Sequence, residues 1–445
     1  MQTRFTAAQL ADADIRDADA ILRACVHCGF CLATCPTYVQ LGDELDSPRG
    51  RIYLIKDMLE GDRTPSAKVA GHIDRCLSCL SCMTTCPSGV DYMHLVDIAR
   101  ARIETRLVRP VGERFLRGML AAVLPRPAVF RLALIAGALA RPFRRLFPAR
   151  WRAALALVPP RIVPLSSGDR PQTFPASGAR RKRVAILPGC AQQILRPAIN
   201  EAATRVLTRM GCEVVVPEGL ACCGALVHHM GRSEDARVSA RAVVRAFHDA
   251  LDDGGLDAVV VTASGCGTMV KDYAHLLRGD AEFGARAAKI AALARDVSEV
   301  IDDLGLAGAA AGTVAPSLPV VAYHAACSLA HGQRIRETPA RLLSSAGFVV
   351  REPVDAHLCC GSAGTYNMLR SELAEPLRAR KAAALAELGA DVIATGNIGC
   401  LTQLAGAAPV PVVHTVELLD WATGGPPPSE LATHKPRARP RLGND

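Results

Sequence analysis

Eight of the 17 cysteines lie within the first 90 residues and form two copies of one pattern. The copies are Cys25-x2-Cys28-x2-Cys31-x3-Cys35-Pro36 and Cys76-x2-Cys79-x2-Cys82-x3-Cys86-Pro87, and equivalent positions are 51 residues apart. Three closely spaced thiolates can hold three corners of one cubane cluster, whereas the fourth, next to proline, reaches the neighbouring cluster. We therefore expect two [4Fe-4S] clusters with crossed ligation, one on Cys25, Cys28, Cys31 and Cys86 and the other on Cys76, Cys79, Cys82 and Cys35.

Cys-x2-Cys spacing also occurs in zinc sites, which are the alternative for this region. The pattern fits zinc poorly, because zinc takes four ligands that typically come as two separated pairs. Here three close thiols and a Cys-Pro step occur twice at one interval. The spacing therefore favours cubane clusters over zinc.

The segment between the two copies is expected to form a helix. Ser47 suits the position before the first turn, Pro48 suits the first turn, and Gly61 suits the end of a helix of about 13 residues. Arg49 and Arg51 on this helix have two interpretations. They either stabilise a reduced, more negative cluster or are solvated surface charges.

A second set of cysteines, beyond residue 180, is also duplicated. Each copy contains four cysteines, and glycine follows the Cys-Cys pair in both. The first copy is Cys190, Cys222, Cys223 and Cys266, and the second is Cys327, Cys359, Cys360 and Cys400. Equivalent cysteines of the two copies are 137, 137, 137 and 134 residues apart. Apolar runs upstream of these cysteines predict parallel strands at 184–187, 213–216, 258–262, 320–323, 348–351 and 392–395. The thiols should therefore converge at the carboxyl ends of two sheets.

These four-thiol sets leave several roles open. One of them could hold a further iron-sulfur centre or a metal, both could be redox thiols, or all could be buried small residues. We expect the two units to be unequal in function. Cys212 has no counterpart and is interpreted as structural, and the histidines that flank the motifs are interpreted as polar neighbours: His228, His229, His324 and His331.

Composition indicates a globular chain of several domains. The 445 residues are 50% hydrophobic and 21% charged, which excludes disorder over most of the length. The N-terminus lacks the apolar region of a secretory signal, and no apolar run approaches the ~20 residues that span a bilayer. These features predict a cytoplasmic protein without a transmembrane helix.

The net charge of +9 is concentrated in residues 114–168, which hold ten arginines and no acidic residue. Prolines interrupt this block, so only short helices are expected, at about 128–141 and 149–157. Basic and apolar side chains together suggest a surface that docks on the inner face of the cell membrane or on partner subunits. The alternatives are a linker whose arginines pair with acidic patches elsewhere and a zinc-containing nucleic-acid-binding protein, and we expect no nucleic-acid partner.

Two ferredoxin motifs followed by two Cys-Cys-Gly (CCG) units resemble the iron-sulfur subunits of membrane-linked 2-hydroxyacid and glycerol-3-phosphate dehydrogenases. Within that group, the stretches 22–31, 34–38 and 42–53 closely resemble the glycolate oxidase (glycolate dehydrogenase) iron-sulfur subunits. The resemblance implies that flavin-binding partner subunits oxidise glycolate and that this chain relays electrons to a quinone-type acceptor. The iron-sulfur subunits of anaerobic glycerol-3-phosphate dehydrogenase and of D-lactate dehydrogenase complexes are the alternatives.

The sequence departs from related heterodisulfide reductases, whose CCG units end in Cys-x2-Cys and can hold a non-cubane cluster. That final thiol is missing after both Cys266 and Cys400. No Gly-x-Gly-x-x-Gly followed by an acidic partner opens an α/β unit, so we expect no flavin in this chain and no activity of the chain alone.

The predicted fold is an α+β multidomain chain with an α-helical ferredoxin-type domain and two duplicated α/β domains. The predicted ranges are 1–105 for the ferredoxin-type domain, 106–180 for a basic helical connector, 181–310 and 318–422 for the two CCG domains, and 423–445 for a disordered tail.

Overall fold

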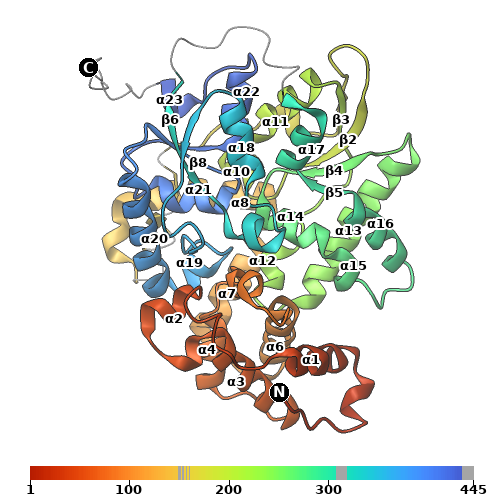
Figure 1. Ribbon diagram of the computed structural model, residues 1–445, viewed down its shortest axis with the longest axis vertical. Helices are drawn as coiled ribbons and strands as arrows, with labels where there is room; N and C mark the ends of the chain where they lie inside the picture. Colours follow the sequence, from red (N-terminus) through yellow and green to blue (C-terminus); the bar gives the residue numbers. More distant parts are fainter. Residues whose placement is uncertain (149–151, 153–154, 157, 160, 307–317, 433–445) are drawn as a thin grey trace.

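The computed structural model describes residues 1–148, 152, 155–156, 158–159, 161–306 and 318–432. Figure 1 shows a helical N-terminal lobe below two sheets that are covered by helices. This arrangement confirms the predicted fold class. The helices of the N-terminal lobe are α1 (Ala13–Ala24), α2 (Pro36–Leu41), α3 (Pro48–Glu60), α4 (Ala67–Asp74), α5 (Ser81–Thr85) and α6 (Tyr92–Arg106).

Helix α3 has the bounds that the sequence predicts. The Ser47 hydroxyl accepts a hydrogen bond from the Gly50 N–H, Pro48 opens the first turn, and Gly61 ends the helix. The α3 side chains Ile52, Ile55 and Leu59 are buried. They pack with α1 and α6 in a core that also contains several of the motif cysteines, so helix packing holds the cysteine loops in place.

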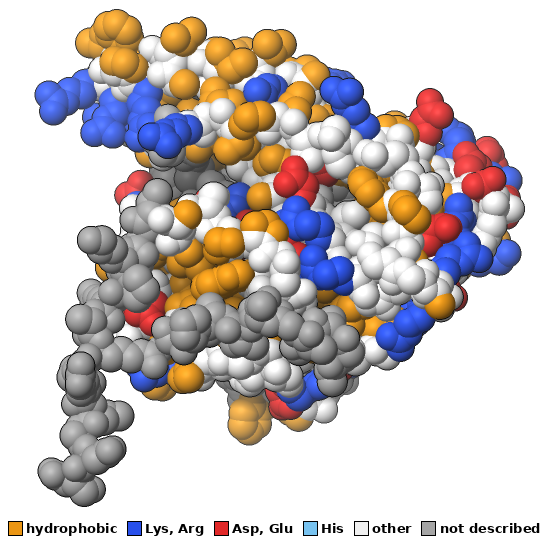
Figure 2. All heavy atoms as spheres, turned by 90° about the horizontal axis from the view of Figure 1, so that it is seen from above, with side chains coloured by type: hydrophobic (Ala, Val, Ile, Leu, Met, Phe, Trp, Pro, Cys, Tyr) orange, Lys and Arg blue, Asp and Glu red, His pale blue; other side chains and the backbone are white. Residues whose placement is uncertain are grey.

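The connector leads from the helical lobe to the first sheet through α7 (Val111–Val123), α8 (Pro127–Ala140) and a 3-10 turn, η3 (Arg141–Leu146). Helix α8 matches the helix predicted at 128–141, whereas the one predicted at 149–157 lies largely outside the described residues. Figure 2 shows hydrophobic and basic side chains gathered along a projecting edge of the molecule. In the part of the chain that the structure describes, no helix combines the length and apolar composition needed to cross a membrane.

The first CCG unit contains a five-stranded sheet in the order β1-β3-β2-β4-β5. All neighbouring strands are parallel except the edge strand β1, which is antiparallel to β3. The strands are β1 (Gln172–Phe174), β2 (Lys182–Leu187), β3 (Cys212–Val216), β4 (Ala258–Val261) and β5 (Ala294–Asp296). The helices are α10 (Gln192–Leu195), α11 (Ala198–Arg209), α12 (Ala225–His228), α13 (Ser233–Asp252), α14 (Ser264–Lys271), α15 (Tyr273–Leu276), α16 (Gly284–Leu293) and α17 (Val297–Leu304).

The second CCG unit contains a four-stranded parallel sheet in the order β7-β6-β8-β9. Its strands are β6 (Val320–His324), β7 (Val349–Arg351), β8 (Val392–Thr395) and β9 (Val412–His414). The intervening elements are a π-helical turn, η6 (Ser328–Gly332), and helices α18 (Thr338–Ser345), α19 (Tyr366–Leu369), α20 (Ser371–Ala386), α21 (Ile398–Ala405) and α22 (Thr415–Ala422). All six predicted strands are present within two residues of their predicted bounds.

The two CCG units share one hydrophobic core. Residues of both sheets, with α11, α17 and α22 between them, belong to a single buried cluster. Ion pairs with buried carboxylates cross the same boundary: Arg196 pairs with Glu417, and Asp420 on α22 accepts from Arg205 and Arg209. The two units therefore form one structural body, although the sequence duplication suggests separate domains.

The range predicted as a disordered tail, 423–445, is in part structured, which corrects the prediction for its first residues. A short helix, α23, spans Ser429–Ala432, and Glu430 within it pairs with Arg196 of the first CCG unit. This ion pair joins the short helix to the first CCG unit. Residues 433–445 lie outside the described part of the chain.

Candidate iron-sulfur centres

The two ferredoxin-type loops share the same left-handed backbone positions. His27 and Gly29 have φ values of 56° and 89°, and Ser78 and Leu80, at equivalent positions of the second loop, have φ values of 48° and 62°. This conformation costs roughly 1 kcal/mol or more for a residue other than glycine. Such strain gathers at ligand-binding sites, where it lets a short loop curl around a bound group.

The loops bring the eight motif cysteines into two neighbouring pockets. The first cysteine pocket is lined by Cys25, Cys28, Cys31 and Cys86, and the second by Cys35, Cys76, Cys79 and Cys82. Each pocket contains three thiols of one motif and the fourth of the other, as crossed ligation requires, although the first pocket also includes Cys82. Cys82 and Tyr92 line both pockets, so the two pockets adjoin.

The donor set and its surroundings fit iron-sulfur clusters. Burial, together with neighbouring thiols, raises the pKa of Cys79 and Cys82 well above the usual range, and burial raises the pKa of Cys31 to about 11. A bound metal deprotonates such thiols outright, because the cation stabilises the thiolate that burial disfavours. Four soft sulfur donors suit iron-sulfur chemistry in both pockets; those of the second pocket are all buried, whereas Cys28 of the first is exposed.

The cysteines of each CCG unit also converge. In the first unit, the Cys190 and Cys222 sulfurs are 3.3 Å apart, and Cys223 contacts both Cys222 and Cys266. In the second, the Cys327 and Cys359 sulfurs are 3.8 Å apart, and Cys360 contacts Cys359 and Cys400. Hydrogen bonds from neighbouring thiols lower the pKa of Cys222 to about 4 and of Cys400 to about 5. Cys212 lies apart on β3 in the apolar core.

The flanking histidines have different surroundings. His228 pairs with Asp97 of the helical lobe, and burial lowers the pKa of its neighbour His229 to about 4. His331 bonds to Thr84 at 2.7 Å. These three fit the sequence interpretation as polar neighbours. His324 differs, because its ring lies among the thiols of Cys360 and Cys400.

Comparison with known proteins identifies the family. Residues 21–90 match the 4Fe-4S dicluster domain, and residues 184–271 and 321–405 match the cysteine-rich domain CCG. The chain is 42% identical to the "Glycolate oxidase iron-sulfur subunit" of Escherichia coli (strain K12), over 95% of this chain and 99% of the relative. This chain belongs to the glycolate oxidase iron-sulfur subunit family.

Two further relatives are similar to the chain at lower identity. The "Probable glycolate oxidase iron-sulfur subunit" of Bacillus subtilis (strain 168) is 34% identical over 90% of this chain and 94% of the relative. The "Lactate utilization protein A" of Geobacillus thermodenitrificans (strain NG80-2) is 29% identical over 54% of this chain and 98% of the relative. The chain is an iron-sulfur, electron-transfer subunit of the glycolate oxidase iron-sulfur family.

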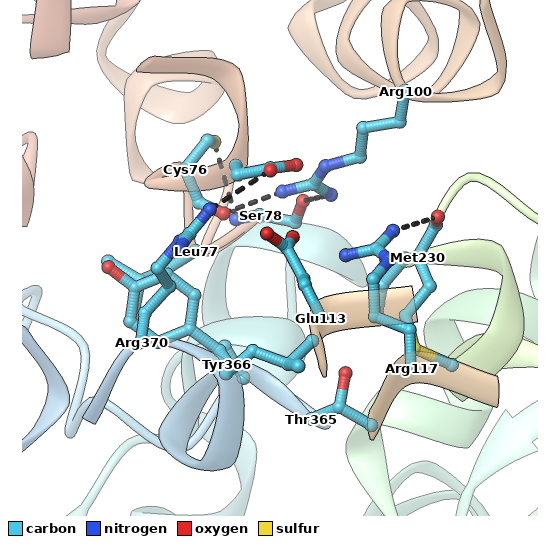
Figure 3. A pocket seen from close by; sticks show the side chains of 14 residues that line it. Cys76, Leu77, Ser78, Arg100, Glu113, Arg117, Met230, Thr365, Tyr366 and Arg370 are labelled. Atoms are coloured by element: carbon cyan, nitrogen blue, oxygen red, sulfur yellow. Dashed lines mark hydrogen bonds and ion pairs between the residues drawn. The ribbon is translucent and has the colours of Figure 1, made fainter. Parts of the chain in front are cut away.

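In this member of the glycolate oxidase iron-sulfur subunit family, a charged pocket lies where four parts of the chain meet (Figure 3). Arg100 donates to the Cys76 carbonyl and to the Ser78 hydroxyl, both at 2.6 Å. Arg117 on α7 donates to the Met230 carbonyl of the first CCG unit at 2.6 Å. Arg100 therefore holds the second ferredoxin-type loop against α6, and Arg117 holds the connector against the first CCG unit.

The two arginines on α3 have different environments in this family member. Arg51 is only 1% exposed, and its Nη1 lies 3.9 Å from the Cys35 sulfur. Its charge is balanced by buried Asp46, which also pairs with Arg75. Arg49 is on the surface beside Glu44 and also donates to the His27 carbonyl of the first loop. Arg51 therefore fits the interpretation that it stabilises a reduced, more negative cluster, whereas Arg49 fits the interpretation as a solvated surface charge.

We expect Arg51→Gln to lower the reduction potential of the cluster in the second cysteine pocket. Reduction adds negative charge, and the variant removes a buried positive charge beside Cys35. The expected decrease is roughly 60 mV or more, which corresponds to a tenfold change for one electron. An EPR-monitored redox titration measures it, with Arg51→Lys and Arg49→Gln as controls. An unchanged potential in an intact Arg51→Gln cluster would contradict the electrostatic role.

Crossed ligation predicts an unequal effect of Cys35→Ser on the two clusters. Because Cys35 lies in the second cysteine pocket, the variant should damage the cluster on Cys76, Cys79 and Cys82 and leave the other mostly assembled. Low-temperature EPR distinguishes the two, and Cys86→Ser should give the reverse pattern. Loss of only the cluster on Cys25, Cys28 and Cys31 in Cys35→Ser would show that the assignment is wrong.

Proposed function

We propose that this chain carries electrons from flavin-binding partner subunits, which oxidise glycolate to glyoxylate, to a quinone-type acceptor. In the proposal, Cys25, Cys28, Cys31 and Cys86 hold one [4Fe-4S] cluster, and Cys76, Cys79, Cys82 and Cys35 hold the other. Each bound cluster supplies one-electron chemistry. The chain contributes ligands, burial and charge, and it contributes no group that removes hydrogen from the alcohol.

A line of sulfur ligands through the molecule carries this proposal. The first cysteine pocket adjoins the second through Cys82 and Tyr92. Cys79 of the second pocket belongs to the same buried apolar cluster as Cys359 of the second CCG unit. Electron transfer needs neighbouring redox groups in surroundings protected from water, and Cys82, Cys79 and Cys359 along this line are all buried.

Counting cofactors in the protein tests the proposal. Anaerobic purification of the chain should give at least about eight iron atoms per chain, as two four-iron clusters require, with matching sulfide. The chain should contain no flavin, whereas its complex with partner subunits should contain flavin. A colourless protein with stoichiometric zinc would contradict the proposal.

Lactate is a second candidate substrate for the complex. The observation that favours it is the match to a "Lactate utilization protein A", which covers only 54% of this chain. The glycolate oxidase relatives match over nearly the full length at higher identity. We therefore place glycolate first, and relative turnover of glycolate, D-lactate and glycerol 3-phosphate by the complex distinguishes the candidates.

We further propose that the connector places the cytoplasmic complex on the inner face of the membrane. Along α8, Leu132 and Leu139 are 66% and 73% exposed, and Phe143 and Leu146 in the following turn are 61% and 82% exposed. Arg141, Arg144 and Arg145 in that turn are exposed and have no carboxylate partner among the described residues. Apolar side chains beside unpaired cations suit the surface of an anionic bilayer.

The triple variant Arg141→Gln, Arg144→Gln and Arg145→Gln should weaken binding to anionic vesicles by about 100-fold, since each arginine near such a surface contributes about 1 kcal/mol. Vesicle co-sedimentation at physiological salt measures this loss. Replacing Arg16, Arg23 and Arg63 with Gln removes the same charge from the helical lobe and should change binding little. Equal binding of both triple variants would contradict the role of the connector, and retained binding of partner subunits would exclude partner docking at this site.

A further inference from the structure

His324 is a buried imidazole without a conventional partner. It ends strand β6 and is 1% exposed, and among the described residues neither ring nitrogen has a nitrogen or oxygen hydrogen-bond partner; its polar neighbour is the Cys400 thiol. Buried polar groups are nearly always satisfied, so an unpartnered one requires an explanation. Here the ligand atoms of His324, Cys360 and Cys400 all lie within 4.8 Å of one another.

The neighbouring thiols extend this group to five donors. Cys360 contacts Cys359, and the Cys359 sulfur lies 3.8 Å from that of Cys327. Cys359, Cys360 and Cys400 are at most 2% exposed. A structural zinc ion takes four ligands in a closed tetrahedron, whereas five donors, four of them soft thiols, suit an iron-sulfur centre.

The first CCG unit differs at the position equivalent to His324. The offset of 137 residues that relates the two units places Leu187 there, at the end of strand β2. Leu187 is 2% exposed and packs in the apolar core of the first unit. The duplication therefore retains four thiols in both units, but a histidine accompanies them only in the second.

The second CCG unit also lies directly against the second cysteine pocket. Cys79 shares a buried apolar cluster with Cys359, Leu77 and Tyr366. The Tyr366 hydroxyl donates to the Arg75 carbonyl at 3.0 Å. A redox centre at Cys359 would thus lie next to a ligand of the second ferredoxin-type cluster, with apolar side chains excluding water.

We propose that the second CCG unit holds a third iron-sulfur centre with His324 as a nitrogen ligand beside the thiolates of Cys327, Cys359, Cys360 and Cys400. This inference rests on the proposed relay function. One electron leaves the reduced cluster at Cys79 and enters this centre, so that the cluster is oxidised and the centre reduced without any bond being broken. The quinone-type acceptor then oxidises the centre. An imidazole in place of a thiolate raises the potential of an iron-sulfur centre, which favours electron flow toward it.

The test compares the wild-type complex with His324→Leu, which places in the second unit the residue found in the first. Pulsed EPR of the reduced wild type should show a centre with strong coupling to a directly bound nitrogen, and iron above about eight atoms per chain. His324→Leu should lose the nitrogen coupling and retain the two cubane signals. His331→Leu is the matched control, because His331 bonds to Thr84 outside the thiol group, and it should keep the coupling.

His324→Cys provides a second variant in case leucine prevents assembly, since it should keep the iron of this centre and lose the nitrogen coupling. Absence of coupling in the wild type, its persistence in His324→Leu, or zinc in place of the third centre would overturn the inference. If any of these results were obtained while both cubane signals remained, the inference would be wrong but the proposed function would be unaffected. Loss of the cubane signals from the wild type would instead refute the proposed function.

Discussion

A preparation of this chain without its flavoprotein partners is expected to oxidise glycolate at no measurable rate. Oxidation of an alcohol carbon removes two electrons, which a flavin can accept in one step, whereas an iron-sulfur cluster typically exchanges one electron at a time. The sequence contains no glycine-rich dinucleotide motif that could hold a flavin.

The rate of glycolate-dependent dye reduction tests this prediction. The protein used must contain its full complement of iron and no flavin. Co-expression with flavin-binding partners should restore turnover. The matched control is the same complex containing Cys79→Ser, which should retain flavin reduction by glycolate and lose transfer to a quinone. Substantial turnover by the flavin-free chain would refute the assignment of glycolate oxidation to the partner subunits.

Cys360→Ala should reduce quinone-linked turnover of the complex by at least about tenfold, equivalent to roughly 1.4 kcal/mol in the barrier, and Cys223→Ala should have a smaller effect. The two residues are equivalent in the duplication and equally buried, at 1% and 2% exposure. They differ in position, because the unit of Cys360 contacts Cys79.

Thermal unfolding of both variants separates the functional effect from a structural one. Cys212→Ala is the control for loss of a buried thiol, because Cys212 is fully buried on β3 and lies outside both four-thiol sets. Equal loss of activity in Cys360→Ala and Cys223→Ala, at unchanged stability, would contradict the expected inequality of the two units.

Local sequence signals were sufficient for much of the fold. Ser47, Pro48 and Gly61 mark the ends of α3 through capping chemistry that depends on neighbouring residues alone. The six predicted strands are apolar runs rich in β-branched residues in two sheets, and all of them except the edge strand β7 are largely buried, which gives a strong pattern. The strands β1, β5 and β9 were not predicted, because each has only three residues, too few to show a comparable pattern.

The parts that sequence reasoning missed depend on residues far apart in the chain. His324 looks like the last residue of a strand, and only the fold brings it to Cys360 and Cys400. Arg100 and Arg117 look like ordinary helix charges, yet Arg100 binds the backbone of the second ferredoxin-type loop and Arg117 binds the backbone of the first CCG unit at the pocket of Figure 3. Motif spacing predicts which thiols can share a cluster, but it contains no information about such distant partners.

The most direct test of the relay is to add glycolate to the oxidised complex under anaerobic conditions without an acceptor. Rapid-mixing absorbance and freeze-quench EPR should show the flavin reduced first and the iron-sulfur clusters of this chain reduced within the time of one turnover. A quinone analogue added afterwards should reoxidise the clusters at the rate of turnover. If the flavin were reduced and reoxidised by the quinone at full rate while the clusters stayed oxidised, the relay function would be contradicted.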